Sequence, residues 1–461
     1  MDGLECKEIA KKRTLTNKDK RIDSQFWTTE IVKNPLYKYS RIGDVILNSQ
    51  YGISVDMNTE KKGYPIFRMN EIHNMLTDLD VEKYADISNA EYRVFELKNK
   101  DVLFNRTNSY EWVGRTGIFY KNNDVPFTYA SYLVKFVTND KVVLPEYLTA
   151  FLNTKVGIRA IKARARQSVN QTNVNPEEVK EIEIPVLSMN FQRNIEQLFI
   201  VANKCRLKSH EMYCDANKKL LEGIKITSAK EQVKYSEKKL TDSFLQSGRL
   251  DAEYYQTKFE EIELAIKNTK HTTLKKLCNL EPGEFISETL YGNEGVSYVR
   301  GTNITSQCID IENAIKVNID INGLKTIEKK DLAFAMIGSV GNVSINREGI
   351  AIVSNNLGAI KPYNKNYSYY LLVYLLSSVG QALFEKYQTR TAQPKIRKED
   401  IGEFLVPILS KDEIEYISQK AKESFKLQEE SLKLLKIAVK TIEMAIETDE
   451  KTALKWLELQ K

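Results

Sequence analysis

The segment Arg21-Ile22-Asp23-Ser24-Gln25-Phe26-Trp27 occurs a second time as Arg249-Leu250-Asp251-Ala252-Glu253-Tyr254-Tyr255. Two further pairs of segments correspond in the same order: Lys100-Asp101-Val102-Leu103-Phe104 with Lys330-Asp331-Leu332-Ala333-Phe334, and 182–186 with 404–408. A period of roughly 225 residues is far longer than the roughly 20 to 50 residues of a solenoid repeat. The pattern therefore predicts a duplicated domain, and a duplicated domain suggests a target that is read in two halves.

The composition permits a polyanionic partner without demanding one. The chain has 461 residues, 68 basic and 62 acidic, for a formal net charge of +6, so a binding surface must come from local clustering. It holds 24 Tyr but 3 His, which favours stacking surfaces over a His-rich metal site. An odd number of cysteines without a Cys-x-x-Cys pair predicts a reduced, cytoplasmic protein: Cys6, Cys205, Cys214, Cys278 and Cys308.

No targeting or membrane segment is expected from the sequence. The first twenty residues are charged throughout, unlike a signal peptide. The most apolar stretch, 369–384, is interrupted by Ser377, Ser378, Gly380 and Gln381, and is too short and too polar to span a membrane. We therefore expect it to be a packed helix.

Each half begins with a polar lead, continues with a block rich in Val, Ile, Phe, Tyr and Gly, and ends in a long helix. The expected fold class is α/β (α+β), with two duplicated mixed α/β domains separated by two long helices that pack as an antiparallel coiled coil. Helical stretches are expected at 146–163 and 369–387. Strands are expected at 64–68, 101–104, 131–137, 297–300, 332–337 and 349–353. The predicted boundaries are a lead at 1–40, a first domain at 41–188, a helix at 189–224, a linker and start of the second repeat at 225–269, a second domain at 270–409, and a helix with its tail at 410–461.

The long helices carry the clearest periodicity. The first has an apolar stripe whose gaps alternate between four and three residues, which is the spacing of a coiled-coil seam. The second opens with Ser410-Lys411-Asp412-Glu413, the pattern of a capping box. One such helix cannot bury its stripe alone, so the two are predicted to pack together. The side chains expected in helix-pair and subunit contacts are Phe191, Ile195, Leu198, Met212, Phe425, Leu432, Leu435 and Ile442.

A search for catalytic chemistry yields no active site. The sequence has no Gly-x-x-x-x-Gly-Lys-Ser/Thr phosphate loop, and its histidines lack metal-ligand spacing. Asn34-Pro35-Leu36-Tyr37 resembles the Asn-Pro-Pro-Tyr motif of amino-methyltransferases, but it lacks the second proline and an accompanying glycine-rich cofactor turn. Chance explains it better. We therefore predict a binding protein with no catalytic residue, no metal and no cofactor of its own.

The binding signal is a recurrent set of Arg, Lys, Asn and Gln residues beside strands and turns. Lys155, Arg159, Lys162 and Arg166 are spaced to share one helix face, and Gln171 follows shortly after. Such a strip can neutralise phosphates, while amide side chains can pair with adenine edges in the major groove. A basic helix face is usually only solvated, but this arrangement recurs at the matching place of the second copy. The candidate DNA contacts are Arg68, Asn70, Arg106, Asn108, Arg115, Lys162, Arg166 and Gln171, and then Arg300, Asn303, Asn355, Asn356, Arg390, Gln393, Lys395 and Arg397.

The order of these features resembles the specificity subunit of type I restriction–modification systems from about Arg41 to Ile446. The residues that carry the resemblance in the first copy are 63–70, 100–107, 113–115, 144–148, 171–175 and 192–195. In the second copy they are 298–304, 338–341, 354–360 and 391–396. Most of these motifs mark scaffold, and Asp101, Asp331, Pro185 and Pro407 are expected to be structural.

The resemblance implies that each α/β domain is a target recognition domain that reads one half of a bipartite double-stranded DNA sequence. The helix pair would set the spacer and dock two adenine methyltransferase subunits, which use S-adenosylmethionine and flip the target adenine. A separate restriction subunit with ATP and Mg would complete the restricting form. Because the two copies differ in sequence, an asymmetric target is expected.

Two other classes of function are compatible with parts of the sequence. A stand-alone methyltransferase or nuclease would need a cofactor fold or metal carboxylates, and neither is found in the sequence. A coiled-coil scaffold that binds only proteins would explain the helices. It would not explain the recurrence of the polar sets, and its behaviour would lack the steep salt dependence of DNA binding.

Overall fold

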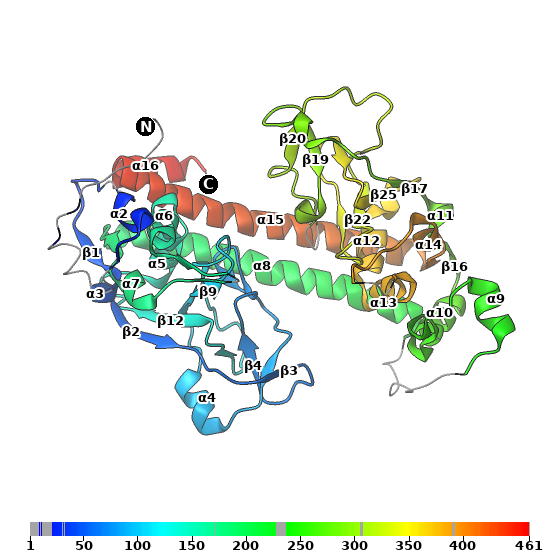
Figure 1. Ribbon diagram of the computed structural model, residues 1–461, viewed down its shortest axis with the longest axis horizontal. Coiled ribbons are helices and arrows are strands. Elements are labelled where there is room, and N and C mark those ends of the chain that lie inside the picture. The colour runs from blue at the N-terminus through cyan, green and yellow to red at the C-terminus, as the bar shows by residue number, and fades with distance from the viewer. Residues whose placement is uncertain are drawn as a thin grey trace. The chain divides into compact units, whose positions relative to one another are not determined.

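The computed structural model describes residues 9, 11, 21–29, 31, 33–169, 171–226, 237–304, 308–389 and 392–460. The chain forms two compact units: unit 1 comprises Met1–Cys205 and Glu429–Lys461, and unit 2 comprises Arg206–Gln428. Each unit contains one mixed α/β domain together with part of each long helix, α8 (Met189–Ile224) and α15 (Lys411–Glu447) (Figure 1). The predicted fold class, a mixed α/β architecture in two copies with long helices, is confirmed.

Unit 1 is built on a six-stranded sheet of order β2-β12-β8-β10-β6-β5. Val102 and Phe104 of β8 point to one core, while Leu103 belongs to the core on the other face. Successive side chains of a strand alternate between faces, so the three residues Val102–Phe104 must all be apolar. The strands are β2 (Ile46–Tyr51), β12 (Leu133–Thr138), β8 (Val102–Asn105), β10 (Thr116–Ile118), β6 (Leu76–Thr77) and β5 (Ile72–His73). A second sheet joins β11 (Thr128–Tyr129), β4 (Tyr64–Phe67), β7 (Tyr84–Ala85) and β3 (Met57–Asn58).

Unit 2 repeats this plan with fewer strands. Its sheet β17-β25-β22-β23 also has a central strand buried on both faces, with Leu332 and Phe334 in one core and Ala333 in another. The strands are β17 (Cys278–Pro282), β25 (Leu357–Pro362), β22 (Leu332–Ala335) and β23 (Val343–Ile345). The second sheet joins β18 (Tyr291–Gly292), β20 (Ile315–Val317), β19 (Val296–Val299), β24 (Ala351–Val353) and β21 (Thr326–Ile327).

The entry and exit of each copy are paired to each other. In unit 1, β1 (Tyr39–Arg41) lies antiparallel to β15 (Glu183–Pro185), and in unit 2, β16 (His271–Thr273) lies antiparallel to β26 (Leu405–Pro407). The hydroxyl of Tyr147 donates to the carbonyl oxygen of Pro185 at 2.7 Å, and Tyr370 does the same to Pro407 at 2.7 Å. Both prolines therefore end a short edge pairing, which fits the structural role expected for them.

The repeated Lys-Asp pair shapes the turn before the central strand. Lys100 and Lys330 both adopt left-handed backbone angles, with φ of 71° and 73°. The buried carboxylates of Asp101 and Asp331 accept the backbone N–H three residues earlier, each at 2.8 Å. The carboxylates thus close a tight turn in each copy, and the structural interpretation of both aspartates agrees with their burial.

Each helical stretch predicted as continuous is two helices. The first is α5 (Pro145–Leu152) and α6 (Lys155–Arg164), and the second is α12 (Ser368–Leu376) and α13 (Ser378–Tyr387). The breaks occur where Thr154 and Ser377 cap the second helix, accepting hydrogen bonds from the N–H of Gly157 (3.0 Å) and Gly380 (3.3 Å). Ser and Thr compete with the helical backbone in this way, so they favour a cap over a helix interior.

The predicted helix face that ended in Arg166 is also wrong. Helix α6 ends at Arg164, because Ala165 is extended with ψ of 135°. Arg166 lies instead on strand β13 (Arg166–Gln167), so it cannot share a helix face with Lys155 and Lys162.

The long helices pack antiparallel within each unit. In unit 1 the hydroxyl of Ser431 donates to the carbonyl oxygen of Ala202 at 2.7 Å; in unit 2 Ser424 donates to Ser209 at 2.7 Å. The predicted Ser410–Glu413 capping box is present. Of the eight side chains predicted for the helix pair, Met212 and Leu432 are half-buried and the rest are buried: Phe191, Ile195, Leu198, Phe425, Leu435 and Ile442.

Shorter helices complete the two units. Those of unit 1 are α2 (Ser24–Thr28), α3 (Ile42–Val45), α4 (Asn89–Phe95), α7 (Pro176–Lys180) and α16 (Glu450–Glu458). Those of unit 2 are α9 (Phe244–Ser247), α10 (Thr257–Lys267), α11 (Leu274–Leu277) and α14 (Lys398–Gly402). Among the helices that the structure describes, none is long and apolar enough to cross a bilayer.

The motif Asn34-Pro35-Leu36-Tyr37 caps the end of α15. The Asn34 carboxamide donates to the carbonyl oxygens of Ile446 (3.0 Å) and Thr448 (2.8 Å), and the Tyr37 hydroxyl donates to Ala445 (3.0 Å). The last carbonyls of a helix have no partner inside it, so side-chain donors stabilise its end. This capping explains the two polar side chains of the motif without any reference to a flipped adenine.

Asn34→Ala should lower the free energy of unfolding of unit 1 by about 1 to 2 kcal/mol, because two helix-end carbonyls lose a donor. All three Trp residues, Trp27, Trp112 and Trp456, belong to unit 1, so the urea midpoint followed by Trp fluorescence reports this unit. Leu36→Ala is the matched control, since that side chain is 68% exposed and should shift the midpoint little. Equal shifts for both variants would contradict the capping role.

Candidate nucleic-acid interface

A small three-stranded sheet joins two of the polar segments found in the first copy. Its order is β13-β14-β9, where β14 is Thr172–Asn173 and β9 is Thr107–Asn108. The register pairs Arg166 with Asn173, and Thr172 with Asn108. The sheet therefore brings the 106–108 segment beside the 166–173 hairpin, although the two lie about sixty residues apart in sequence.

Arg106 enters this sheet with its guanidinium only partly engaged. Its backbone N–H donates to Tyr132 (3.0 Å) and its carbonyl oxygen accepts from Val174 (2.9 Å), so the main chain is fixed on both sides. The guanidinium carbon lies 5.1 Å from the ring centroid of Tyr51, which is 44% exposed. Its Nη1 donates to the carbonyl oxygen of Ser131 at 3.5 Å, and its Nε–H, which is buried, has no hydrogen-bond partner among the described residues. A stacked guanidinium whose Nη groups keep further donors can bind a phosphate or a base edge.

A second arginine–aromatic pair lies next to the first. Arg115 stacks on Trp112 with its guanidinium carbon 3.4 Å from the ring centroid, and Trp112 is 43% exposed. The carbonyl oxygen of Arg115 accepts from the N–H of Asn105 (2.8 Å), the residue before Arg106. Burial lowers the pKa of Arg115, and the ordinary value is high enough that the side chain stays charged at neutral pH. Partial burial strengthens its attraction to an anion.

The described residues between β13 and β14 are exposed to solvent. Ser168 closes this hairpin, donating to the carbonyl oxygen of Gln171 from both its backbone N–H (2.8 Å) and its hydroxyl (3.0 Å). Val169 is fully exposed, and Gln171 is exposed beside it. A two-stranded ribbon of this kind has the width that fits the major groove of B-form DNA.

Two of the predicted cations in unit 1 are engaged within the protein. The Lys162 ammonium donates to the carbonyl oxygens of Tyr110, Glu111 (3.2 Å) and Val113 (2.9 Å), and burial lowers its pKa. Arg68 donates to Glu71 through Nε at 3.0 Å and through Nη2, which also reaches Glu82. Asn70 is exposed in the turn after Arg68. Arg166 is a third paired cation, since its Nη2 donates to Glu178 at 3.0 Å. These engagements favour Arg106, Arg115 and Gln171 over Lys162, Arg68 and Arg166 as external donors.

Unit 2 forms the matching arrangement with different side chains. Lys395 pairs with Ile337 in an antiparallel bridge, and the N–H of Gly338 donates to the carbonyl oxygen of Pro394 at 2.9 Å. The segment with Gln393 and Lys395 therefore lies beside the strand end that corresponds to 106–108, and both side chains are exposed. The guanidinium groups of unit 1 are absent from these positions, so the two surfaces differ chemically.

The turn at Asn355–Asn356 lies next to the same strand end. Both residues are exposed, and Asn356 accepts a backbone hydrogen bond from Met336 at 2.9 Å. Arg300 is exposed where β19 ends, and β19 runs parallel to β24, so Arg300 and Asn355 leave the sheet at one edge. Asn303 is buried, and its Oδ1 accepts the N–H of Arg300 at 3.0 Å.

The remaining predicted residues in unit 2 contribute less to this surface. Arg397 is paired with Asp400 through two hydrogen bonds, at 2.9 and 2.8 Å. Arg390 lies outside the described residues. Elsewhere in the described chain, no three His, Cys, Asp or Glu side chains converge as a metal site.

Sequence reasoning did not single out the exposed aromatic residues of the first surface. These are Tyr51, Trp112 and Tyr132, the last 37% exposed. The high Tyr content was a general signal for stacking, but these three lie on separate segments. Strand pairing brings Tyr51 and Tyr132 beside Arg106. Trp112 lies three residues before Arg115, so that pair could have been found from sequence spacing.

Comparison with known proteins gives one family for both copies. A family model described as "Type I restriction modification DNA specificity domain" matches residues 35–208 and 266–454, well over half of the chain. The EcoKI specificity subunit of Escherichia coli, a type I restriction enzyme, is 24% identical over 183 residues. The MjaX specificity subunit assigned in Methanocaldococcus jannaschii is 26% identical over 178 residues. Each match covers 38% of this chain, and 39% and 42% of the respective relative.

Two solved structures are also similar to this chain. The S subunit of a type I restriction–modification system from M. genitalium has a TM-score of 0.38 at 16% identity, covering 92% of this chain and 98% of that one. The HsdS subunit from Thermoanaerobacter tengcongensis has a TM-score of 0.31 at 13% identity, covering 91% and 98%. By the match of the family model to both of its copies, this chain belongs to the type I restriction modification DNA specificity domain family.

Proposed function

We propose that this chain is the specificity subunit of a type I restriction–modification complex and recognises a bipartite, asymmetric sequence in double-stranded DNA. In this proposal each unit reads one half-site. The observation that carries it is the presence of two surfaces at the same place of a duplicated fold, one with Arg106, Arg115 and Gln171, the other with Gln393 and Lys395. Different donors recognise different base edges, so the two half-sites should differ.

The side chains of the two surfaces favour contacts with different bases. Arginine pairs with two acceptors on a guanine edge, and Gln or Asn pairs with adenine, while lysines neutralise phosphates. Unit 1 offers stacked guanidinium groups and Gln171; unit 2 offers the amides of Gln393 and the Asn355–Asn356 turn. We therefore expect guanine contacts to contribute more to the first half-site than to the second.

The chain acts in this proposal without catalysis of its own. Two adenine-N6 methyltransferase subunits would dock on it, hold S-adenosylmethionine and methylate an adenine that is flipped from the duplex. A restriction subunit that uses ATP and Mg would join them in the restricting form. Helices α8 and α15 each contribute residues to both units, which is why we assign to them the length of the spacer between half-sites.

Sequencing of N6-methyladenine in the source genome, with and without this gene, tests the proposal. Deletion should remove one bipartite, asymmetric methylation motif and leave all others unchanged. The motif also supplies the half-sites and the spacer for later binding experiments. Unchanged motifs in a strain that still expresses the partner methyltransferase would contradict the proposal and favour a protein-binding scaffold.

A further inference from the structure

The repeated lead segments, 21–27 and 249–255, each close over the end of a helix. In unit 1 the Nη1 of Arg21 donates to the carbonyl oxygen of Arg164, the last residue of α6, at 2.8 Å. Its Nε and Nη2 donate to the two carboxylate oxygens of Asp23, at 2.7 and 2.9 Å. The Arg21 side chain is 5% exposed, so a residue from the start of the chain is buried against a helix end far along it.

The second lead segment makes the same contacts in unit 2. Arg249 donates through Nη1 to the carbonyl oxygen of Tyr387, the last residue of α13, at 2.7 Å, and through Nη2 to Gln388 at 3.0 Å. Asp251 accepts from Nε at 2.8 Å and from Nη2 at 2.5 Å. The contact between the arginine, its aspartate and the helix end therefore occurs once in each copy.

An aromatic side chain closes each lead segment on itself. The indole Nε1 of Trp27 donates to the carbonyl oxygen of Arg21 at 2.9 Å, and the Tyr255 hydroxyl donates to that of Arg249 at 2.8 Å. The guanidinium groups also lie over rings, at 4.9 Å from Phe26 for Arg21 and 4.7 Å from Tyr254 for Arg249. These contacts hold each arginine side chain in position against its helix end.

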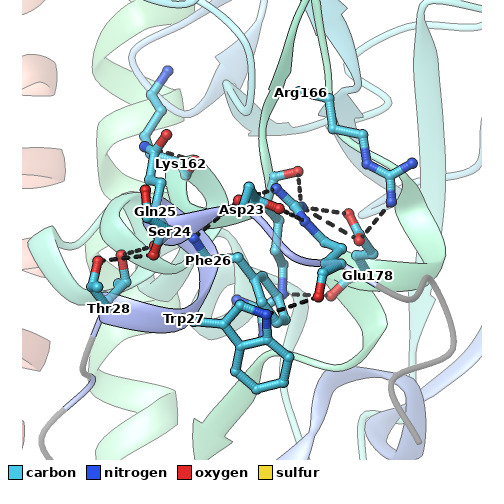
Figure 2. A network of polar contacts seen from close by, with 12 residues as sticks. Asp23, Ser24, Gln25, Phe26, Trp27, Thr28, Lys162, Arg166 and Glu178 are labelled. Atoms are coloured by element: carbon cyan, nitrogen blue, oxygen red, sulfur yellow. Dashed lines mark hydrogen bonds and ion pairs between the residues drawn. The ribbon is translucent and has the colours of Figure 1, made fainter. Parts of the chain in front are cut away.

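We call the contacts that Arg21 or Arg249 makes with its aspartate and its helix end a clamp. The clamp of unit 1 continues into the hairpin between β13 and β14. Glu178, which is buried, accepts from Arg21 Nη1 at 3.2 Å and from Arg166 Nη2 at 3.0 Å. Figure 2 shows Glu178 facing Arg166, with Asp23 and Phe26 of the lead segment beside it. Arg166 is the first residue of β13, so the lead segment is connected through one carboxylate to the strand that begins the hairpin.

The lead segment of unit 2 reaches the matching point. Gln388, whose carbonyl oxygen Arg249 binds, directly precedes Thr389, and the N–H of Thr389 donates to the carbonyl oxygen of Lys395 at 2.8 Å. The N–H of Lys395 in turn donates to the hydroxyl of Thr389 at 3.1 Å. Each clamp therefore holds the residue that leads into the segment carrying Gln171 or Gln393.

We propose that Arg21 and Arg249 are positioning residues for DNA recognition: Arg21 holds the first strand of the β13–β14 hairpin, and Arg249 holds the residue before Thr389, which is hydrogen-bonded to Lys395, so that the donors of each surface meet the bases in a fixed geometry. This inference rests on the proposed function. A residue near the helix end could cap it equally well. Here each copy instead uses its lead segment, 21–27 or 249–255, which lies far away in sequence and binds the end of the corresponding helix, α6 or α13. Preorganised donors bind more tightly because less conformational freedom is lost on binding.

Hydrogen exchange of the full chain tests the clamp without any DNA. Arg21→Ala should raise amide exchange of 166–173 by about tenfold and leave 388–395 unchanged, and Arg249→Ala should do the reverse. Ile22→Ala and Leu250→Ala are matched controls, because these side chains lie next to the arginines but are 86% and 77% exposed. Unchanged exchange in both arginine variants would overturn the inference. Should Arg21→Ala fail to fold, Arg21→Lys, which keeps the charge but loses the paired donors, replaces it under the same criteria.

Duplex binding by the same variants then tests the positioning role. The probes are the methylated motif found by genome sequencing and duplexes with one half-site scrambled. Arg21→Ala should reduce discrimination against a change in one half-site by about tenfold, with the salt slope of binding unchanged, because phosphate contacts remain. Faster hairpin exchange with unaltered discrimination would overturn the positioning role. A parent chain that fails to discriminate half-sites would instead refute the proposed function, while the exchange data would still report on the clamp.

Discussion

Lys100→Met should lower the free energy of unfolding of unit 1 by about 3 kcal/mol, because it leaves a buried carboxylate without its cation. The Lys100 ammonium lies 3.0 Å from Glu146 and 2.5 Å from Glu196 of α8. Glu146 is fully buried, and the Tyr120 hydroxyl also donates to it at 2.9 Å. The ammonium therefore joins the turn before β8 to helices α5 and α8. The measurement is the urea midpoint of the Trp fluorescence transition.

The second copy supplies the matched control. Lys330 has the same place in its turn and nearly the same φ, 73°, but its ammonium makes no ion pair with any residue that the structure describes. Lys330→Met should therefore change the stability of unit 2 little. The double variant Lys100→Met with Glu146→Gln should recover much of the loss, since it removes the buried charge as well. A loss in the double variant as large as in the single one would contradict the ion-pair explanation.

The destabilisation caused by Lys100→Met should depend on pH in a direction set by Glu146. Burial raises the pKa of Glu146, so the folded chain binds this proton more readily than the unfolded chain. Such a group lowers stability as pH rises from the unfolded pKa, about 4.3, through the raised folded pKa. Without the ammonium that opposes the effect of burial, the folded pKa should rise further. The loss in Lys100→Met should thus be smaller at pH 5 than at pH 8, and Glu146→Gln should abolish the difference.

Arg106→Ala should weaken binding of the cognate duplex by about ten- to a hundredfold, the equivalent of about 1 to 3 kcal/mol for a paired base contact. The side chain is stacked on Tyr51, its backbone is held on both sides, and its Nη1 reaches the carbonyl oxygen of Ser131 only at 3.5 Å, so the Nη groups keep donors for a ligand. If the guanidinium reads a base, discrimination at one half-site should fall while binding of unrelated duplexes is retained. If it binds a phosphate, all duplexes should weaken alike, and the salt slope should fall by about one.

Arg68→Ala is the contrasting variant for this experiment. Its guanidinium is already bound by Glu71 and Glu82, so its replacement should change the stability of unit 1 more than DNA affinity. The comparison uses fluorescence anisotropy with the cognate duplex, together with the urea midpoint of each variant. Strong loss of affinity in Arg68→Ala with none in Arg106→Ala would place the interface elsewhere on the unit.

The sequence was most informative where a pattern has one physical solution. Buried strands need apolar residues on both faces, and the heptad stripes of α8 and α15 need a partner helix, so both could be predicted from residue spacing. The Ser410–Glu413 box could be predicted for the same reason, since its hydrogen bonds lie within one helical turn. The helix breaks at Thr154 and Ser377 could not be predicted, because a Ser or Thr hydroxyl can cap a helix or lie within one.

At the candidate interface, sequence spacing was a poor guide to which side chains are available for binding. Spacing placed Lys162 and Arg166 on one helix face, but Lys162 is bound by carbonyl oxygens of a turn and Arg166 lies on a strand. Which cations are internally paired depends on carboxylates and carbonyls from distant segments, and no local pattern records these. Tyr51, the stacking partner of Arg106, was missed for the same reason, whereas Trp112 lies only three residues before Arg115.

The duplication, the mixed α/β class of each copy, the two long helices and the family could all be predicted, because they follow from local spacing and from the order of motifs along the chain. The folded chain was needed to show that the helix ends at Arg164, that the 106–108 segment pairs with the 166–173 hairpin, and that the repeated lead arginines bind two helix ends. A helix end and a side chain's partners are set by groups that become neighbours only on folding. Their hydrogen bonds are therefore properties of the packed chain and not of any segment within it.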